Sequence, residues 1–208
     1  MVRTNSNCHL RSSRRGVERL PRGWFLGLCS IAALGFFAGT DLLAQQPKPN
    51  EYQVKATYLY NFGRFVQWPH NAMAVKGDSF SICVLGQDPF GPSLDSTLTG
   101  ETLDGKPLAV KRISTARDAG ECRILFISSK EENRLKEILD ALDEWSILTV
   151  SDMPSFSRRG GMIQFVLEGN KVRFEINLAK AESAKLTLSS ELLKVATTVR
   201  RNAGQGGP

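Results

Sequence analysis

The run Cys122–Val150, CRILFISSKEENRLKEILDALDEWSILTV, contains a predicted strand, a predicted helix and a second predicted strand. Its first part, Cys122–Ile127, is apolar almost throughout, which is typical of a strand covered on both faces. Apolar residues then recur at helical spacing from Leu135 to Leu142, and Ile147–Val150 is again short and β-rich. A strand, a helix and a strand in this order favour a parallel sheet with helices against its faces.

The residues before this run repeat the alternation. Phe80–Gly86 (FSICVLG) and Leu108–Ile113 (LAVKRI) predict two further strands, with a short helix through Leu94 to Leu98 between them. Earlier still, residues from Glu51 onward follow the helical period and carry many aromatic side chains, and Pro69 is expected to end that helix. The predicted fold class is therefore α/β, a mostly parallel sheet flanked by helices.

The segment 162–177 breaks this pattern and predicts a hairpin. Gly169-Asn170 is a two-residue turn between Met162–Glu168 and Lys171–Asn177, and a tight turn of this kind fixes which residues face each other. We expect an antiparallel hairpin at the edge of the parallel sheet, followed by helical segments at 178–185 and 191–200. The expected pairs are Leu167–Val172, Phe165–Phe174 and Ile163–Ile176 on the apolar face, and Glu168–Lys171, Val166–Arg173 and Gln164–Glu175 on the polar face.

The first 44 residues have the character of an export signal. Arginines precede Trp24, and the uncharged apolar run Leu26–Ala38 is followed by a small residue at Ala44, as in a cleaved secretory signal peptide. An uncleaved anchor is the alternative, although the run is short for a membrane span. We expect a signal peptide at 1–44, a linker at 45–50, an α/β domain at 51–200 and a flexible tail at 201–208.

The net charge of +6 belongs mostly to this leader. Six arginines and two acids in the first 44 residues contribute +4, which leaves +2 for the rest of the chain. A nucleic-acid partner is therefore not expected, because such a partner requires a strongly basic domain.

Export would also place the remaining cysteines in an oxidising compartment. Cys83 and Cys122 stay after the leader is removed. A disulfide between them would close a loop of about 40 residues and raise the free energy of unfolding by about 4 kcal/mol. The alternative is a pair of buried free thiols in neighbouring strands.

The exported part offers little catalytic or metal chemistry. His70 is its only histidine, and neither zinc-type nor calcium-type ligand spacing occurs. We therefore expect no catalytic residues, no metal site and no cofactor. Gly86, Gln87 and Asp88 remain a candidate ligand loop, because ligands of α/β sheets bind beyond the carboxyl ends of strands.

Several segments together resemble the YfiR family of periplasmic proteins, which includes the repressor of the YfiN diguanylate cyclase. The resemblance runs from about residue 51 to residue 196. The matching segments are EYQVKATYLYNFGRFVQWP (Glu51–Pro69), FSICVLGQDPFG (Phe80–Gly91), CRILFIS (Cys122–Ser128), LTVSDMPSF (Leu148–Phe156), GGMIQFV (Gly160–Val166) and VRFEINLAKAESAKLTLSSELLKVA (Val172–Ala196).

This resemblance implies a periplasmic, often dimeric α/β domain without catalytic machinery. Such a protein binds the periplasmic sensor part of an inner-membrane diguanylate cyclase and represses it, which lowers cyclic di-GMP and biofilm formation. Cys83 and Cys122 match a disulfide position of the family, whereas a second cysteine pair found in relatives is missing here. Some relatives serve other membrane receptors such as sensor kinases, so a domain that senses a small ligand for such a receptor is the alternative.

A binding protein of this kind requires anchor residues at its interface. Aromatic and arginine side chains dominate most interfaces, and charged neighbours set their specificity. The candidates for partner binding are Tyr60, Trp68, Phe156, Arg173 and Glu175.

Overall fold

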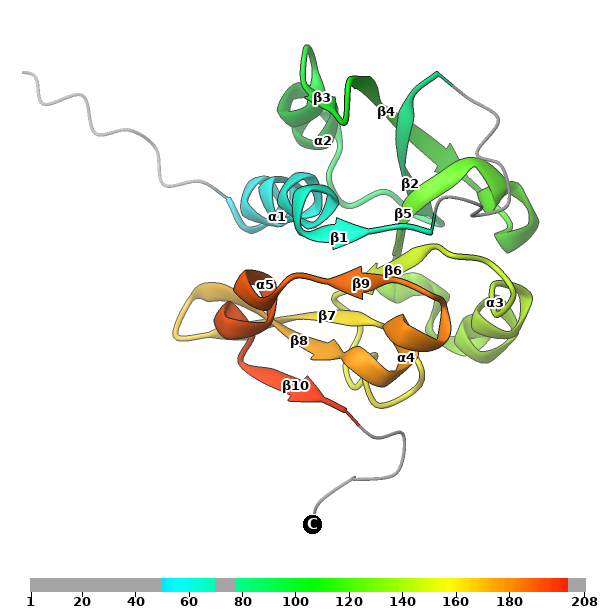
Figure 1. Cartoon of the computed structure of the whole chain (residues 1–208), viewed down its shortest axis with the longest axis vertical. Helices are drawn as coiled ribbons and strands as arrows, with labels where there is room; N and C mark the ends of the chain where they lie inside the picture. The colour runs from blue at the N-terminus through cyan, green and yellow to red at the C-terminus, as the bar shows by residue number, and fades with distance from the viewer. Residues whose placement is uncertain (1–49, 70–77, 202–208) are drawn as a thin grey trace, which may run out of the picture. The chain divides into compact units, whose positions relative to one another are not determined.

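A mixed sheet of eight strands forms the centre of the computed structural model, which describes residues 50–69 and 78–201. Its strand order is β10-β8-β7-β6-β5-β2-β4-β3 (Figure 1). Residues 1–49, 70–77 and 202–208 lie outside the described part of the chain. The predictions for the signal peptide, most of the linker, His70 and nearly all of the tail fall there. The strands are β2 (Phe80–Leu85), β3 (Thr102–Leu103), β4 (Lys106–Ile113), β5 (Cys122–Ile127), β6 (Leu148–Ser151), β7 (Ile163–Glu168), β8 (Lys171–Asn177) and β10 (Thr198–Arg200).

The parallel part of the sheet confirms the predicted fold class. β2 lies between β4 and β5 and is parallel to both, and β5, β6 and β7 continue in parallel. Every residue of β2 is buried, as expected for a strand with helices against both faces. Antiparallel pairs occur toward the two ends of the sheet, between β3 and β4 and between β7 and β8.

The β7–β8 hairpin has the predicted register. All six expected pairs are present, from Ile163 with Ile176 to Glu168 with Lys171. Gly169 and Asn170 adopt φ values of 52° and 61°, which is the positive-φ geometry that a two-residue hairpin turn requires.

The end of the chain differs from the sequence prediction. The last helix was expected to reach Arg200, but α5 (Ser190–Val195) ends earlier and β10 pairs in parallel with Glu175–Asn177 of β8. The backbone N–H and the hydroxyl of Thr197 both donate to the carbonyl of Phe174, at 2.9 and 3.1 Å, and these bonds direct the chain onto the sheet. The predicted helix was wrong here because this tertiary pairing outweighs the local helical pattern.

The first helix, α1 (Glu51–Phe65), begins at a capping box and ends before the proline. Asn50 and Gln53 each bond the other's backbone N–H, both at 2.9 Å. Beyond Phe65 the chain is extended, because β1 (Val66–Gln67) pairs with β9 (Thr187–Leu188). Pro69 was predicted to end the helix, but this strand pairing ends it first.

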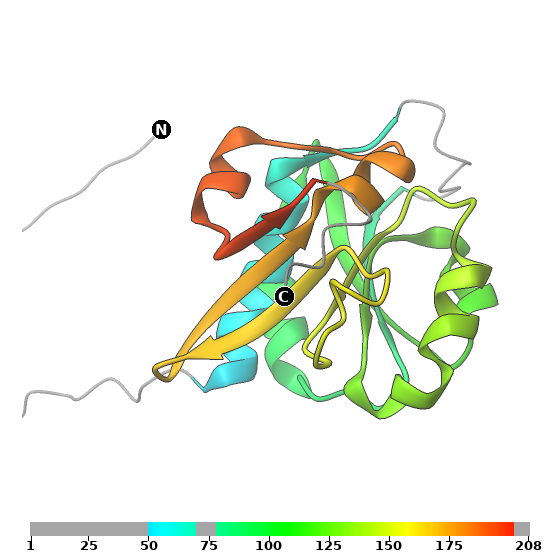
Figure 2. The same ribbon diagram turned by 90° about the horizontal axis from the view of Figure 1, so that it is seen from below.

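Helices cover the two faces of the sheet and enclose two apolar clusters. Figure 2 shows α1 and α5 on one side of the sheet and α3 (Leu135–Ala141) on the other. The first cluster includes residues of α1, α2 (Pro92–Leu98), α4 (Leu178–Ser183) and α5, and the second includes α3 and the 3-10 helix η1 (Ala116–Glu121). A second 3-10 helix, η2 (Ser129–Arg134), leads into α3.

A disulfide joins Cys83 of β2 to Cys122 at the start of β5, within the second cluster. Their Cα atoms are 5.8 Å apart, and both side chains are buried. Of the two possibilities that the sequence left open, the structure therefore has the bridge.

Candidate functional site

The residues predicted to bind a partner lie in separate environments. Tyr60 is half-buried on α1, and its hydroxyl donates to Glu101 at 2.9 Å, which raises the pKa of Tyr60. Trp68 follows β1, and its ring packs edge-on against Phe80 with the ring centres 5.3 Å apart. These two aromatic residues are therefore both engaged within the chain.

Arg173 and Glu175 share the polar face of β8 but differ in their contacts. Glu175 is half-buried and accepts from the hydroxyl of Ser157 at 2.8 Å and from Arg200 at 3.4 Å. Arg173 is exposed and makes no ion pair with any residue that the structure describes. Of the two, Arg173 is the one available to a partner.

Phe156 does not lie on the surface. Its side chain is 0% exposed within the second apolar cluster, and the backbone N–H of Gly161 donates to its carbonyl at 2.9 Å. A Cβ on Gly161 would lie only 2.1 Å from the Phe156 ring, so the loop between β6 and β7 is packed closely around this side chain. Phe156 is a core residue, and we no longer include it among the interface candidates.

The candidate ligand loop has a structural explanation in the residues around it. Asp88 accepts from the backbone N–H of Phe90 at 2.7 Å and from Arg112 at 3.0 Å. Gly86 has φ of 85°, and the Glu131 side chain packs directly against it. Phe90, which follows the loop, is buried against Phe126 of β5. These contacts determine the shape of residues 86–88 without a ligand.

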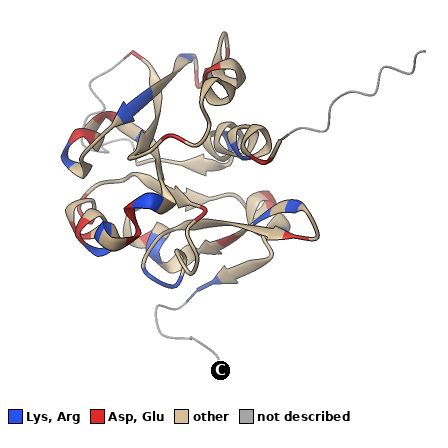
Figure 3. Cartoon of the chain, turned by 180° about the vertical axis from the view of Figure 1, so that it is seen from behind, with Lys and Arg blue, Asp and Glu red and all other residues tan. Residues whose placement is uncertain are grey.

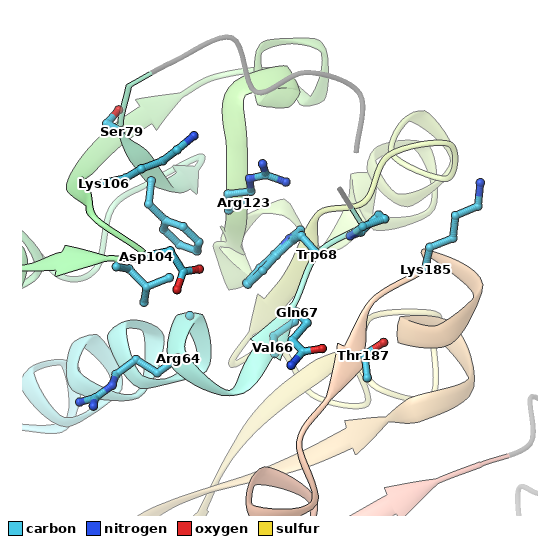
Figure 4. A pocket seen from close by; sticks show the side chains of 14 residues that line it. Arg64, Val66, Gln67, Trp68, Ser79, Asp104, Lys106, Arg123, Lys185 and Thr187 are labelled. Atoms are coloured by element: carbon cyan, nitrogen blue, oxygen red, sulfur yellow. The ribbon is translucent and has the colours of Figure 1, made fainter. Parts of the chain in front are cut away.

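A cavity of about 800 Å³ lies instead at the amino ends of the parallel strands. Ser79 precedes β2 and Phe80 begins it, Lys106 begins β4 and Arg123 lies near the start of β5. The rest of the lining comes from the end of α1, from β1 and the two residues after it, from β3 and its turn into β4, and from Lys185 and Thr187 near the start of β9 (Figure 4). The sequence prediction placed a ligand at the opposite, carboxyl end of these strands.

The polar lining of this cavity is mainly cationic. Arg64, Lys106, Arg123 and Lys185 contribute positive charge and Asp104 contributes negative charge. Figure 4 shows Arg123 and Trp68 pointing into the same space. Such a lining favours ligands that carry an anionic group.

Two buried donors among the lining residues have no acceptor within the part of the chain that the structure describes. Nη1 of Arg123 and Nε1 of Trp68 are buried without a hydrogen-bond partner among the described residues. Burial lowers the pKa of Arg123 because desolvation disfavours its charged form. A buried donor without an acceptor costs free energy, so a ligand or a partner group that supplies acceptors here would gain that energy on binding.

Sequence analysis missed this cavity because its residues come from many separate segments. One indication was available: Arg123 is the single charged residue inside the apolar run Cys122–Ile127. A charged side chain in a strand covered on both faces requires a polar neighbour, a ligand or access to solvent.

A second polar cluster lies at the carboxyl end of β6. Lys55 is 2% exposed, and its Nζ contacts Asp152 at 2.7 Å and also Glu51. The hydroxyl of Tyr52 donates to the same Asp152 oxygen at 3.1 Å. Burial and the Asp152 charge raise the pKa of Tyr52 to about 12. This cluster ties α1 to the sheet, and we assign it a structural role.

The described residues show no metal-binding or membrane-spanning feature. Within 50–69 and 78–201, no three His, Cys, Asp or Glu side chains are grouped so that they could hold a metal ion. In the same ranges, no helix has the length and apolar character needed to cross a membrane. Figure 3 shows both signs of charge distributed over the helices and the hairpin.

A family model described as YfiR/HmsC-like matches residues 52–197. The chain belongs to this family. The YfiR/HmsC-like region runs from the first turn of α1 to the residue before β10, so it includes both apolar clusters, the disulfide and the cavity. The resemblance found in the sequence is thereby confirmed.

Two solved structures are similar to the chain at low identity. A conserved domain protein from Vibrio cholerae O1 biovar El Tor is 12% identical, with 72% of this chain and 60% of that chain covered and a TM-score of 0.49. The ABC domain in complex with L-Trp from Streptococcus pneumonia is 9% identical, with 58% and 55% covered and a TM-score of 0.43. The chain thus spans less than two thirds of either protein. No curated protein sequence matches it.

Proposed function

We propose that the chain is a periplasmic regulatory protein that represses an inner-membrane diguanylate cyclase by binding its periplasmic sensor part. The protein would lower cyclic di-GMP and biofilm formation without performing chemistry itself. The observation that carries this proposal is the YfiR/HmsC-like match over residues 52–197.

The redox chemistry of the chain supports a periplasmic location. A disulfide joins Cys83 and Cys122, and such bonds persist in oxidising compartments. The basic and apolar leader at residues 1–44 gives a route of export.

Repression by binding alone has a definite energetic requirement. A binder shifts its partner only by the difference between its affinities for the partner's two states. A change from mostly active to mostly inactive needs about 5.5 kcal/mol of such preference. An interface of about 800 Å² on each protein, with a few dominant anchors, can supply it.

Deletion of the gene tests the proposal in cells. Cyclic di-GMP and surface attachment should rise on deletion and return to their original levels when the full chain is supplied. A chain that lacks residues 1–44 and stays in the cytosol is the matched control and should not restore them. Unchanged cyclic di-GMP, in cells that contain the membrane cyclase, would contradict the proposal.

A second function is favoured by the cavity at the amino ends of the strands. Its unpaired donors on Trp68 and Arg123 suit a small anionic ligand, so the domain would sense such a ligand for a membrane receptor such as a sensor kinase. In a thermal-shift screen of small carboxylates and phosphates, a compound that binds this cavity should raise the melting temperature of the protein, because ligand binding stabilises the folded state. The shift should disappear in Arg123→Met, and a screen without any shift would remove this alternative.

A further inference from the structure

The apolar face of the β7–β8 hairpin continues beyond the core that covers it. Ile163 and Phe165 are buried on this face, but Leu167, the next residue on the same face, is 57% exposed. Its cross-strand neighbour Val172 is only half-buried. The hairpin therefore has one apolar pair, Leu167–Val172, that the described part of the chain does not bury.

Two adjoining hollows lie along α1, and the larger of them lies between α1 and this hairpin tip. One of about 630 Å³ is bounded by Val54 and Tyr58 of α1 and by Leu167 and Val172 of the hairpin. The other, of about 410 Å³, is also bounded by Val54 and Tyr58. We call these two hollows together the hairpin groove.

One side of the hairpin groove is an open strand edge. β10 pairs only with Glu175–Asn177, so no described strand pairs with Lys171–Arg173 on that side. Glu168 and Lys171 flank the two-residue turn and form a hydrogen-bonded pair, and the two kinds of pair alternate along an antiparallel hairpin. The next pair, Leu167–Val172, is therefore non-hydrogen-bonded, and the N–H and C=O of Val172 point away from β7. The hydroxyl of Tyr58 reaches this carbonyl at 3.5 Å, which agrees with that direction. An extended segment can therefore add here as a further strand.

The charges beside this edge indicate what such a segment carries. Lys171 and Arg173 are exposed, and neither takes part in an ion pair within the described ranges. Glu51, which also borders the hairpin groove, is already paired with Lys55. Glu168, which faces Lys171 across the hairpin, is also exposed and has no ion pair among the described residues, so the net free charge beside the edge is still positive.

We propose that the hairpin groove binds an extended, acidic segment of the membrane partner, which adds as a strand to the open edge of β8. Side chains of a strand alternate between two faces. One set would be apolar and lie against Val54, Tyr58 and Leu167. The other would be acidic and face Lys171 and Arg173. This inference rests on the proposed function, since it names the surface through which the partner is held.

The test measures binding to the purified periplasmic domain of the inner-membrane diguanylate cyclase that the proposed function assigns as the partner. The chain from Gln45 onward is compared with two altered forms, Leu167→Asp and the double variant Lys171→Glu/Arg173→Glu. Each should bind at least about tenfold more weakly, as expected for loss of an anchor or of charge complementarity. The loss in the charge-reversed variant should shrink as salt rises from about 50 to about 500 mM, because salt screens exposed charges.

Matched controls separate the groove from general surface effects. Val195→Asp alters an apolar side chain that is 60% exposed but does not border the groove, and Arg117→Glu reverses an exposed charge on η1. Both should bind like the unaltered chain. The backbone amide of Val172 should exchange quickly with solvent in the free chain and become protected on binding.

Each contrary outcome has its own meaning. Normal binding by both groove variants would overturn this inference and leave the proposed function intact, whereas no binding by the unaltered chain would remove the proposed function and this inference with it. If the unaltered chain is a dimer and Leu167→Asp is a monomer, the groove binds a second copy of this chain, and the inference is overturned. If the Val172 amide is protected from exchange with solvent in the free monomer, another segment of the same chain already pairs with this edge, and the inference is overturned.

Discussion

Breaking the Cys83–Cys122 disulfide should lower the free energy of unfolding by about 4 kcal/mol. The bridged residues are 39 positions apart, and the loop-closure model for a loop of this length gives about 4 kcal/mol at 25 °C. Both cysteines are buried and their strands β2 and β5 pair directly, so the folded state holds them together with or without the bond. The loss therefore arises mainly from the greater freedom of the reduced unfolded chain.

The assay is urea unfolding of the chain from Gln45 onward, followed by tryptophan fluorescence. The oxidised protein is compared with protein that has been unfolded, reduced and refolded in reductant. Reduction should lower the midpoint and raise the urea dependence of the unfolding free energy, because an unfolded chain without the cross-link exposes more surface.

The double variant Cys83→Ala/Cys122→Ala serves as the control. Its stability should not respond to reductant, and any further loss relative to the reduced chain measures the packing of the two sulfurs. A difference of less than about 1 kcal/mol between oxidised and reduced protein would refute the loop-closure reasoning, since that model gives several times as much.

Three further predictions concern other parts of the fold. Asp152→Ala should destabilise the protein by about 1–3 kcal/mol because the buried Lys55 would keep only its pair with Glu51, and Lys55→Met should do the same because Asp152 would keep only the Tyr52 hydroxyl; losses in urea unfolding that simply add in the double variant would contradict this coupling. The folded-state pKa of Tyr52, raised from 10.0 to about 12, contributes stability that is complete below pH 10 and is lost as the pH rises toward 12. Tyr52→Phe should therefore lose less stability over that interval, and identical pH profiles would show that the tyrosine is not responsible. Gly161→Ala should cost about 2 kcal/mol or more, because its Cβ would overlap a buried aromatic ring, while Gly120→Ala meets only ordinary contacts; similar melting temperatures would disprove the overlap.

Local patterns were sufficient to predict the four strands β2, β4, β5 and β6 and the β7–β8 hairpin, but not β3 or β10. The apolar run Cys122–Ile127 coincides with β5, and the turn at Gly169-Asn170 determines all six hairpin pairs. In these segments the local preference and the tertiary structure agree, so the sequence alone carries the information.

The failed predictions concern residues whose state depends on distant partners. Thr198–Arg200 follow a helical pattern but form β10, because Thr197 is bonded to Phe174. Phe156 lies in a loop without periodicity, so nothing local distinguished a core position from an exposed one. The cavity could not be predicted for the same reason, since α1, β2, β4 and β5 meet there only in the folded chain.

The contacts of α1 have a consequence for the order in which the molecule folds. Tyr52 bonds to Asp152, 100 positions later in the chain, and Tyr58 contacts Val172, 114 positions later. A polypeptide that crosses a membrane starting from its N-terminus brings out this helix first, while its packing partners are still on the other side. If the chain is exported as proposed, native structure can close around α1 only after residues 152 and 172 have crossed the membrane, and slow formation of such long-range contacts helps to keep the chain unfolded until then.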